Sequence, residues 1–212
     1  MSASCQRLHD WLSRLPRLKR EDLGGVPPNG VYVLFEGGET GHGGERIVRV
    51  GTHTGQNNLG PRIREHLYTS NKDRSIFRKH VGCCLLARAG DVFLDQWKID
   101  LTTKRSRQAS ADKIDRTKLA QIENDVTQYM CTNFSFTVLR IDQASERLRV
   151  ECGLLSTIFQ CRDCGPSTNW LGKFHPTRAI IRESGLWNVL GLNNAALSAG
   201  QVQEIMKVGA VA

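Results

Sequence analysis

Apolar residues recur at helical spacing near the start of the chain and alternate with strand spacing soon afterwards. Residues 5–20 carry leucines and a tryptophan three or four positions apart, which predicts a helix. A Pro-Pro-Asn-Gly break follows. Residues 30–36 (GVYVLFE) and 46–52 (RIVRVGT) read as β-strands, and the glycine-rich stretch 37–45 joins them. The pattern predicts a hairpin with a long loop.

Helical patterns dominate the rest of the chain. Asn58 is placed to cap a helix with Pro61 in its first turn. A later helix is expected to turn Leu148 and Leu154 toward a core. The expected helices cover about 58–67, 75–87, 113–129, 145–160, 176–191 and, more weakly, 198–208, while a third strand covers 134–141 and the pattern of 88–110 is ambiguous.

Clustered strands with helices around them predict an α+β fold. We expect a small three-stranded, mainly antiparallel sheet flanked by helices, and one domain over 1–212. Within it, an N-terminal helix would occupy 1–25, a helical insertion 68–130 and a C-terminal helical extension 173–212.

Composition narrows the class of protein. At 40% hydrophobic residues the chain can bury a core, and it has no run of about 18 apolar residues, so no membrane span is expected. The first residues lack a continuous apolar segment of the secretory type, which favours a cytoplasmic protein. A net charge of +8 favours polyanionic partners, nucleic acid first and anionic membrane second.

The cysteines are read as reduced thiols. There are seven, an odd number. Cys161 and Cys164 form a C-x-x-C pair, but no second pair exists, and Cys152 and His175 would complete a zinc set only by chance folding. Plain thiols are therefore favoured over a metal knuckle.

The hairpin places one tyrosine beside one arginine. Because side chains alternate along a strand, Tyr32 and Leu34 share a face. If the hairpin is symmetric about its loop, position 32 lies opposite about position 49, which sets Arg49 beside Tyr32. A bulge would shift this pairing by one residue and spoil it.

The helix after the hairpin carries Arg62 and His66, which are four apart and share one face. This face is expected near the sheet, so tyrosine, arginine and histidine would converge. A phenol loses its proton at pH about 10, and nearby cations favour the anion. An arginine can fork onto phosphate oxygens, whereas the leaving oxygen needs a metal or an acid. Mg²⁺ in turn needs a hard oxygen ligand such as a carboxylate.

At these positions the sequence resembles the GIY-YIG nuclease superfamily over about residues 26–190. Gly30-Val31-Tyr32 matches the first half-motif and Arg49-Val50-Gly51 the second, where tyrosine usually stands in place of arginine. Arg62 and His66, Glu151 ahead of apolar positions, and Asn169 within STNWLG also fit. Within the family the chain more closely resembles an uncharacterised bacterial subgroup with RVGTH, S-I-F-R-x-H-V-G and SGLWN segments, here at 49–53, 75–82 and 184–188.

The resemblance implies a role for each matched residue. Tyr32 would be the general base that activates water, and His66 would orient it or help to deprotonate it. Arg62 would stabilise the phosphate charge. Glu151 would be the lone protein ligand of Mg²⁺ (or Mn²⁺), and Asn169 would support the site by hydrogen bonding.

Arg49 departs from the family pattern, in which tyrosine stands at this position. The change removes one phenol as a proton carrier. We count it as a sixth catalytic position, since a cation there would favour the phenolate. Substrate binding is assigned to His53, Arg64 and Arg78. Glu146 is a carboxylate that competes with Glu151 for the metal role.

The leading hypothesis is a metal-dependent endonuclease that hydrolyses DNA phosphodiester bonds in restriction or phage defence. The alternative is a catalytically inactive nucleic-acid-binding protein with the same fold, which the arginine at position 49 motivates. A third hypothesis is a structural or partner-binding domain without affinity for nucleic acid. DNA is the favoured partner, RNA and a homodimer stay open, and no membrane partner is expected.

Overall fold

The computed structural model of the protein describes residues 3–209. Its centre is a three-stranded sheet of order β2–β1–β3, in which both neighbouring pairs are antiparallel. Strand β1 spans Gly30–Gly41, β2 spans Gly44–Gly51 and β3 spans Phe134–Arg140. The expected α+β class, with a small antiparallel sheet flanked by helices, is confirmed.

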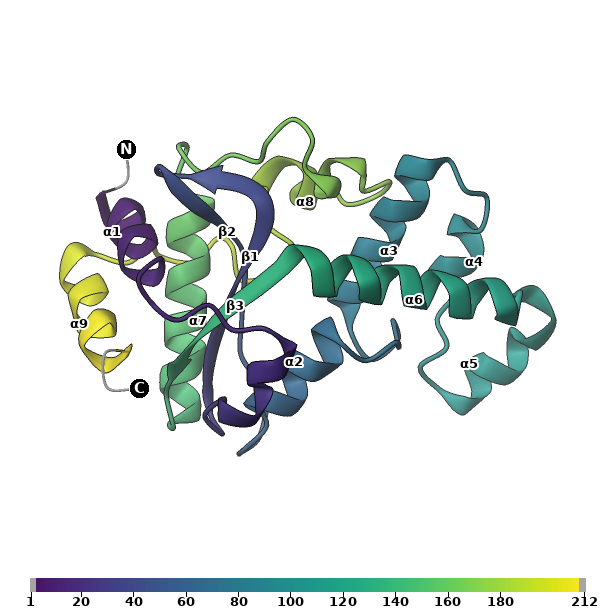
Figure 1. Ribbon diagram of the computed structural model, residues 1–212, viewed down its shortest axis with the longest axis horizontal. Coiled ribbons are helices and arrows are strands. Elements are labelled where there is room, and N and C mark those ends of the chain that lie inside the picture. The colour runs from purple at the N-terminus through teal and green to yellow at the C-terminus, as the bar shows by residue number, and fades with distance from the viewer. Residues whose placement is uncertain (1–2, 210–212) are drawn as a thin grey trace.

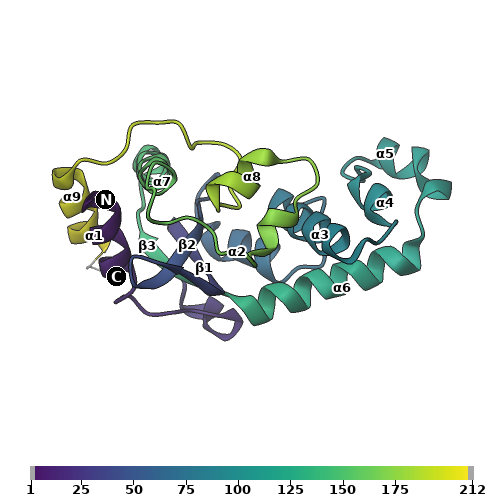
Figure 2. The same cartoon turned by 90° about the horizontal axis from the view of Figure 1, so that it is seen from above.

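Helices cover both faces of the sheet (Figure 1). Figure 2 shows α1 and α9 side by side at one end of the molecule, with α6 running toward α4 and α5 at the other end. In the described residues the α-helices are α1 Ala3–Leu12, α2 Leu59–Leu67, α3 Ile76–Ala89, α4 Leu94–Lys98, α5 Lys104–Ala109, α6 Arg116–Asn133, α7 Ala144–Phe159, α8 Ala179–Ser184 and α9 Ala199–Gly209. Short 3₁₀ turns occupy Arg20–Gly25, Ala111–Lys113 and Leu171–Phe174.

Strand β1 is buried on both faces because two separate cores pack against it. Val31, Val33 and Phe35 face apolar side chains of α1, α7 and α9. Tyr32 and Leu34 face the other core, which α2, α3 and α6 complete. An uninterrupted apolar run is the pattern that a strand covered on both faces requires.

The hairpin differs from the expected one in its loop and its register. Most of the stretch 37–45 is strand, and the chain turns over His42 and Gly43, whose φ values of 53° and 79° are those of a mirror-type two-residue turn. Tyr32 pairs with Gly51, and Arg49 pairs with Leu34. The expected pairing of Tyr32 with position 49 was therefore wrong by two residues. Because the side-chain period is two, Arg49 nevertheless stays on the Tyr32 face.

Several helices also depart from the expected bounds. The first helix ends at Leu12 instead of residue 20, ahead of Pro16, which cannot donate a helical hydrogen bond. The helix expected over 176–191 is confined to α8, which ends where Gly185 adopts a φ of 71°. Leu148, expected in the core, is 55% exposed. The ambiguous stretch 88–110 contains α4 and α5.

The outer edge of β2 is covered by the segment that follows α8. The Trp187 N–H donates to the Val48 carbonyl at 2.8 Å. Both polar atoms of the Asn188 amide bond the Val50 backbone, since Nδ2 donates to its carbonyl at 2.8 Å and Oδ1 accepts its N–H at 3.2 Å. These contacts occupy backbone groups that an edge strand would otherwise leave unpaired.

A buried carboxylate at Glu36 joins three segments to β1. The side chain is 3% exposed and accepts hydrogen bonds from Tyr129 Oη at 2.6 Å, Trp170 Nε1 at 2.8 Å and Trp187 Nε1 at 2.9 Å. Burial raises the pKa of the Glu36 carboxyl above its usual value, and the three bonds oppose that rise. Glu36 thereby ties α6 and the segments around residues 170 and 187 to the sheet.

Replacing Glu36 by alanine is expected to lower the free energy of unfolding by roughly 3 kcal/mol or more, because three buried donors lose their acceptor. Urea-induced unfolding measures this change. Glu45→Ala is the control, since it removes only an exposed ion pair with Arg17 and should cost less than about 1 kcal/mol. Equal losses in the two variants would contradict a stabilising role for Glu36.

Candidate active site

The side chain of Tyr32 lies over a glycine of the neighbouring strand. A Cβ atom on residue 51 would stand 2.3 Å from Tyr32 Oη, closer than any tolerated contact. Gly51 therefore leaves the space that the phenol ring fills. Tyr32 itself is 1% exposed. The conformation of Tyr32 thus depends on the absence of a side chain at residue 51.

His66 lies beside Tyr32 and is hydrogen-bonded to Ser75. The two ring centroids are 5.9 Å apart, and His66 Nδ1 is 2.6 Å from Ser75 Oγ. Ser75 also caps α3 by accepting the Arg78 backbone N–H. His66 Nε2 is buried and has no hydrogen-bond partner among residues 3–209. Burial holds the pKa of His66 well below its ordinary value, and cationic Arg49 adds to the effect.

Arg49 is 9% exposed and packed over an aromatic ring. Its guanidinium carbon stands 4.8 Å from the centroid of Phe77, and Nη1 donates to the Trp187 carbonyl at 3.3 Å. Leu34 pairs with Arg49 and Phe35 pairs with Ile47, so Val48 is the extra residue of a bulge in β2. Val48 and Arg49 therefore both lie on the Tyr32 side of the sheet. The departure from the tyrosine of the motif is therefore accommodated by stacking and by one backbone hydrogen bond.

Glu151 on α7 reaches the end of β2 and borders one hollow together with Thr52. Burial raises the pKa of the Glu151 carboxyl, while the Arg49 cation, the nearby Thr52 backbone N–H and the Arg62 cation oppose the rise. The carboxylate borders two hollows. One of about 510 Å³ is shared with Thr52, His53 and Arg62, and one of about 250 Å³ is shared with Arg49.

Arg62 is partly exposed at the rim of the larger hollow. Its Nη1 donates to Glu65 Oε2 at 3.1 Å, and Glu65 also pairs with Arg74 at 2.5 Å. Burial acts to raise the pKa of Glu65, but the hydrogen bonds from Arg74 and Arg62 outweigh it and lower the pKa. Glu65 therefore stays anionic and fixes the position of both arginines.

The structure brings together Tyr32, Arg49, His66 and Glu151, with Arg62 beside the carboxylate. It also places His53 in the larger hollow, where Nε2 accepts the Gly30 N–H at 3.3 Å.

Three other expected residues lie elsewhere. Arg78 is fully buried between α3 and α6, where Nη2 pairs with Glu123 at 3.0 Å, so the expectation that it binds substrate is corrected. Arg64 is exposed on α2, and Asn169 is exposed in a turn and borders neither hollow. The competing carboxylate of Glu146 pairs with Arg149 at a different hollow.

Sequence reasoning missed two contributors to this site. Asn188 lines the smaller hollow and bonds the Val50 backbone, and Thr52 lines the larger hollow beside Glu151. The SGLWN segment was the signal for Asn188, because it contains an asparagine directly after a buried tryptophan. The family motif had pointed to the asparagine at position 169 instead.

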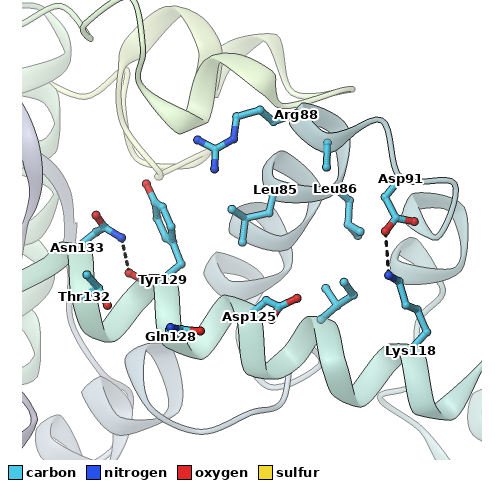
Figure 3. Close-up of a pocket in the computed structure, with 12 residues that line it drawn as sticks. Leu85, Leu86, Arg88, Asp91, Lys118, Asp125, Gln128, Tyr129, Thr132 and Asn133 are labelled. Atoms are coloured by element: carbon cyan, nitrogen blue, oxygen red, sulfur yellow. Dashed lines mark hydrogen bonds and ion pairs between the residues drawn. The ribbon is translucent and has the colours of Figure 1, made fainter.

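A further hollow of about 530 Å³ lies between α3 and α6 (Figure 3). Its charged residues are mixed, because Arg88 and Lys118 lie with Asp91 and Asp125. Lys118 Nζ and Asp91 Oδ2 pair at 3.1 Å, which neutralises one end. The residues that line this hollow include the phenol of Tyr129 but no histidine, and their charges balance, so it does not combine the groups that phosphodiester chemistry needs.

A family model described as the GIY-YIG domain matches residues 4–199. The chain belongs to the GIY-YIG family. No curated protein and no solved structure matches the chain. GIY-YIG proteins are endonucleases that typically depend on a divalent metal, so the class is nuclease and the substrate class is nucleic acid. Within residues 3–209, no helix has the length and apolar character needed to cross a bilayer.

Gly51→Ala is expected to displace the Tyr32 ring, because the new Cβ would overlap Oη. Displacement of a reacting group by about 1 Å can lower kcat/KM by about 100-fold, and this is the expected loss of nuclease activity. Steady-state cleavage kinetics measure it. Gly44→Ala on the same strand meets open space and should keep wild-type kinetics. Unchanged activity in Gly51→Ala would show that the position of Tyr32 is not critical.

His66 is expected to stay neutral in the folded protein as pH falls through 6.5, its ordinary value. The unfolded chain binds a proton there and the folded chain does not, so stability is lost as pH falls below that value. Nuclear magnetic resonance of the His66 ring should show no titration between about pH 8 and pH 5.5, whereas the ring should titrate normally in denaturant. A folded-state titration near the ordinary pKa would contradict the burial argument.

Proposed function

We propose that this protein is a metal-dependent endonuclease that hydrolyses DNA phosphodiester bonds. One observation carries the proposal: a phenol and a carboxylate lie against two consecutive residues at the end of β2. Tyr32 Oη lies over Gly51, and the next residue, Thr52, lines the same hollow as Glu151. The phenol proposed as the base for water and the carboxylate proposed as the ligand for a cation therefore lie at the same short segment.

The donor set fits the divalent ion on which the family depends. Mg²⁺ is usually held by one or two carboxylates, with water and substrate phosphate supplying the other oxygens. Two carboxylates, Glu65 and Glu151, border the open hollow of about 510 Å³. Glu65 is paired with Arg62 and Arg74, so Glu151 is the carboxylate that meets this requirement. Glu151 would hold Mg²⁺ or Mn²⁺, and the bound ion would supply stabilisation of the charge on the phosphate and the leaving oxygen.

The protein side chains would divide the remaining work. Tyr32 takes a proton from the attacking water. If the Nδ1–H of His66 donates to Ser75 Oγ, Nε2 keeps its lone pair, through which His66 would orient the phenol of Tyr32 by accepting a hydrogen bond. Arg62 lies at the rim of the hollow and offsets phosphate charge. His53 and Arg64 would contact the substrate, and Asn169 would act only through a neighbouring residue.

The choice of DNA rests on charge and on family resemblance. A net charge of +8 attracts polyanions generally, so RNA is an outcome of the same experiment. A role in restriction or phage defence, in a cytoplasmic protein, completes the proposal. A homodimer would supply two such sites for cutting both strands.

The second candidate is a nucleic-acid-binding protein without catalysis. Two observations favour it. Tyr32 is 1% exposed, so water and phosphate reach it only if neighbouring side chains shift. Arg49 replaces the second phenol of the motif and is engaged with Phe77 and the Trp187 carbonyl.

Purified protein with Mg²⁺ or Mn²⁺ is expected to nick supercoiled plasmid, and Glu151→Gln is expected to reduce cleavage to background while retaining DNA binding. The amide keeps the shape of the side chain but is a much poorer ligand for a hard cation. Glu146→Gln on the same helix is the matched control, because Glu146 pairs with Arg149 at another hollow.

Wild-type protein that binds DNA in a salt-dependent manner but cuts no double-stranded DNA, single-stranded DNA or RNA would favour the second candidate. Absence of both binding and cleavage at low salt would exclude both candidates. Equal cleavage by Glu151→Gln and wild type would remove Glu151 from the site.

A further inference from the structure

Three thiols and an imidazole from three distant segments meet beside the tip of the hairpin. Cys5 lies on α1, His42 is in the turn between β1 and β2, and Cys161 and Cys164 follow α7. Their ligand atoms all lie within 4.8 Å of one another. Cys5 and Cys164 are 159 positions apart in the chain, so folding alone brings them together.

Three of the six pairs of ligand atoms lie close to the separation expected around one tetrahedral ion. The Sγ atoms of Cys5 and Cys164 are 3.5 Å apart, and those of Cys161 and Cys164 are 3.6 Å apart. Cys161 Sγ and His42 Nε2 are 3.3 Å apart. With Zn–S of about 2.3 Å and Zn–N of about 2.0 Å, ligand atoms around tetrahedral zinc lie roughly 3.5–3.8 Å from one another. The S–S bond of a disulfide is about 2.05 Å long, so at these distances no disulfide joins the sulfur atoms.

His42 is held in the tautomer that a metal ligand requires. Gln6 Nε2 donates to Asp10 Oδ1 at 2.8 Å, which turns the amide oxygen of Gln6 toward His42. His42 Nδ1 lies 2.9 Å from that oxygen and must donate its proton to it. Nε2 then carries the lone pair and points at the thiol of Cys161. Such an outer hydrogen bond is typical of histidines that bind metals.

The backbone at His42 has the conformation that the tight turn requires. Its φ of 53° lies in the left-handed region, as does the φ of 79° at Gly43. From this position the imidazole Nε2 reaches the thiol of Cys161.

A second histidine close to the cluster is occupied by the backbone. His9 Nδ1 is 3.0 Å from the Cys5 carbonyl, and His9 Nε2 accepts the Ile47 N–H at 3.4 Å. The same nitrogens lie 3.6 Å from Cys5 Sγ and 3.9 Å from Cys164 Sγ, respectively. With both ring nitrogens engaged, His9 borders the cluster and is not a fifth ligand. The ligand set is therefore three cysteines and His42.

We propose that Cys5, His42, Cys161 and Cys164 bind one structural Zn²⁺. Thiolate and imidazole ligands select zinc, whereas the single carboxylate of Glu151 suits a hard cation such as Mg²⁺, so the two sites differ in chemistry. Four protein ligands leave no open position for water or substrate, which makes the site structural. The ion links α1, the hairpin tip and the loop after α7.

The test measures metal in full-length protein purified under reducing conditions. Elemental analysis should find about one zinc per chain after dialysis, as expected for a closed four-ligand site. Cys161→Ser and Cys164→Ser should each lose the ion. Cys131→Ser, which alters a thiol on α6 outside the cluster, should keep it. Glu151→Gln should also keep it, and loss of zinc there would assign the ion to the nuclease site and overturn the proposal.

Cobalt provides a readout that does not depend on the variants folding. Wild-type protein stripped of zinc and loaded with Co²⁺ should show thiolate-to-cobalt charge-transfer bands and the visible bands of tetrahedral coordination. The bands should disappear when Zn²⁺ is added. Wild-type protein that takes up neither metal, octahedral Co²⁺ spectra, or zinc retained when both Cys161 and Cys164 are serine would each overturn the proposal.

Discussion

The hydrogen bonds accepted by Glu36 are the interaction on which the geometry of the site depends. They anchor the indoles of Trp170 and Trp187 to the central strand, although both residues come late in the chain. Once Trp187 is anchored, its backbone N–H can donate to the Val48 carbonyl, and its carbonyl can accept a hydrogen bond from the Arg49 guanidinium. A carboxylate remote from the proposed chemistry therefore positions a cation beside Glu151. The cost of burying this carboxyl group is offset by the three hydrogen bonds that it accepts.

The proposed site lies where the sheet ends, at the junction of two cores. Tyr32 and His66 belong to the core on the α2 side, while Glu151 comes from a helix that packs on the opposite face. The carboxylate of Glu151 comes close to Tyr32 and His66 only because β2 is an edge strand and ends at Gly51. A longer β2 would place backbone between the helix and the phenol.

Local patterns predicted the fold class and the helical spacing of Arg62 and His66, because these depend on residues close in the chain. Strand alternation also put Arg49 on the correct face, although the register was wrong by two.

The turn over His42 and Gly43 could not be derived from composition, because the glycines of the expected loop are compatible with either strand or loop. The choice between Asn169 and Asn188 depended on which segment covers β2, which is a long-range contact. The meeting of Cys5 with Cys164 depends on the whole topology, so the C-x-x-C pair had no visible partners.

Both outer edges of the sheet are covered by other segments of the chain, which limits how copies of this chain can associate. The segment around Trp187 occupies the outer side of β2, and Leu18 exchanges two backbone hydrogen bonds with Phe136 on the outer side of β3. Neither edge presents a free backbone ladder at these positions, so a second copy cannot extend the sheet there by strand addition. A dimer that placed two active sites on one duplex would have to form through helical surfaces, and its symmetry would be set by side-chain complementarity.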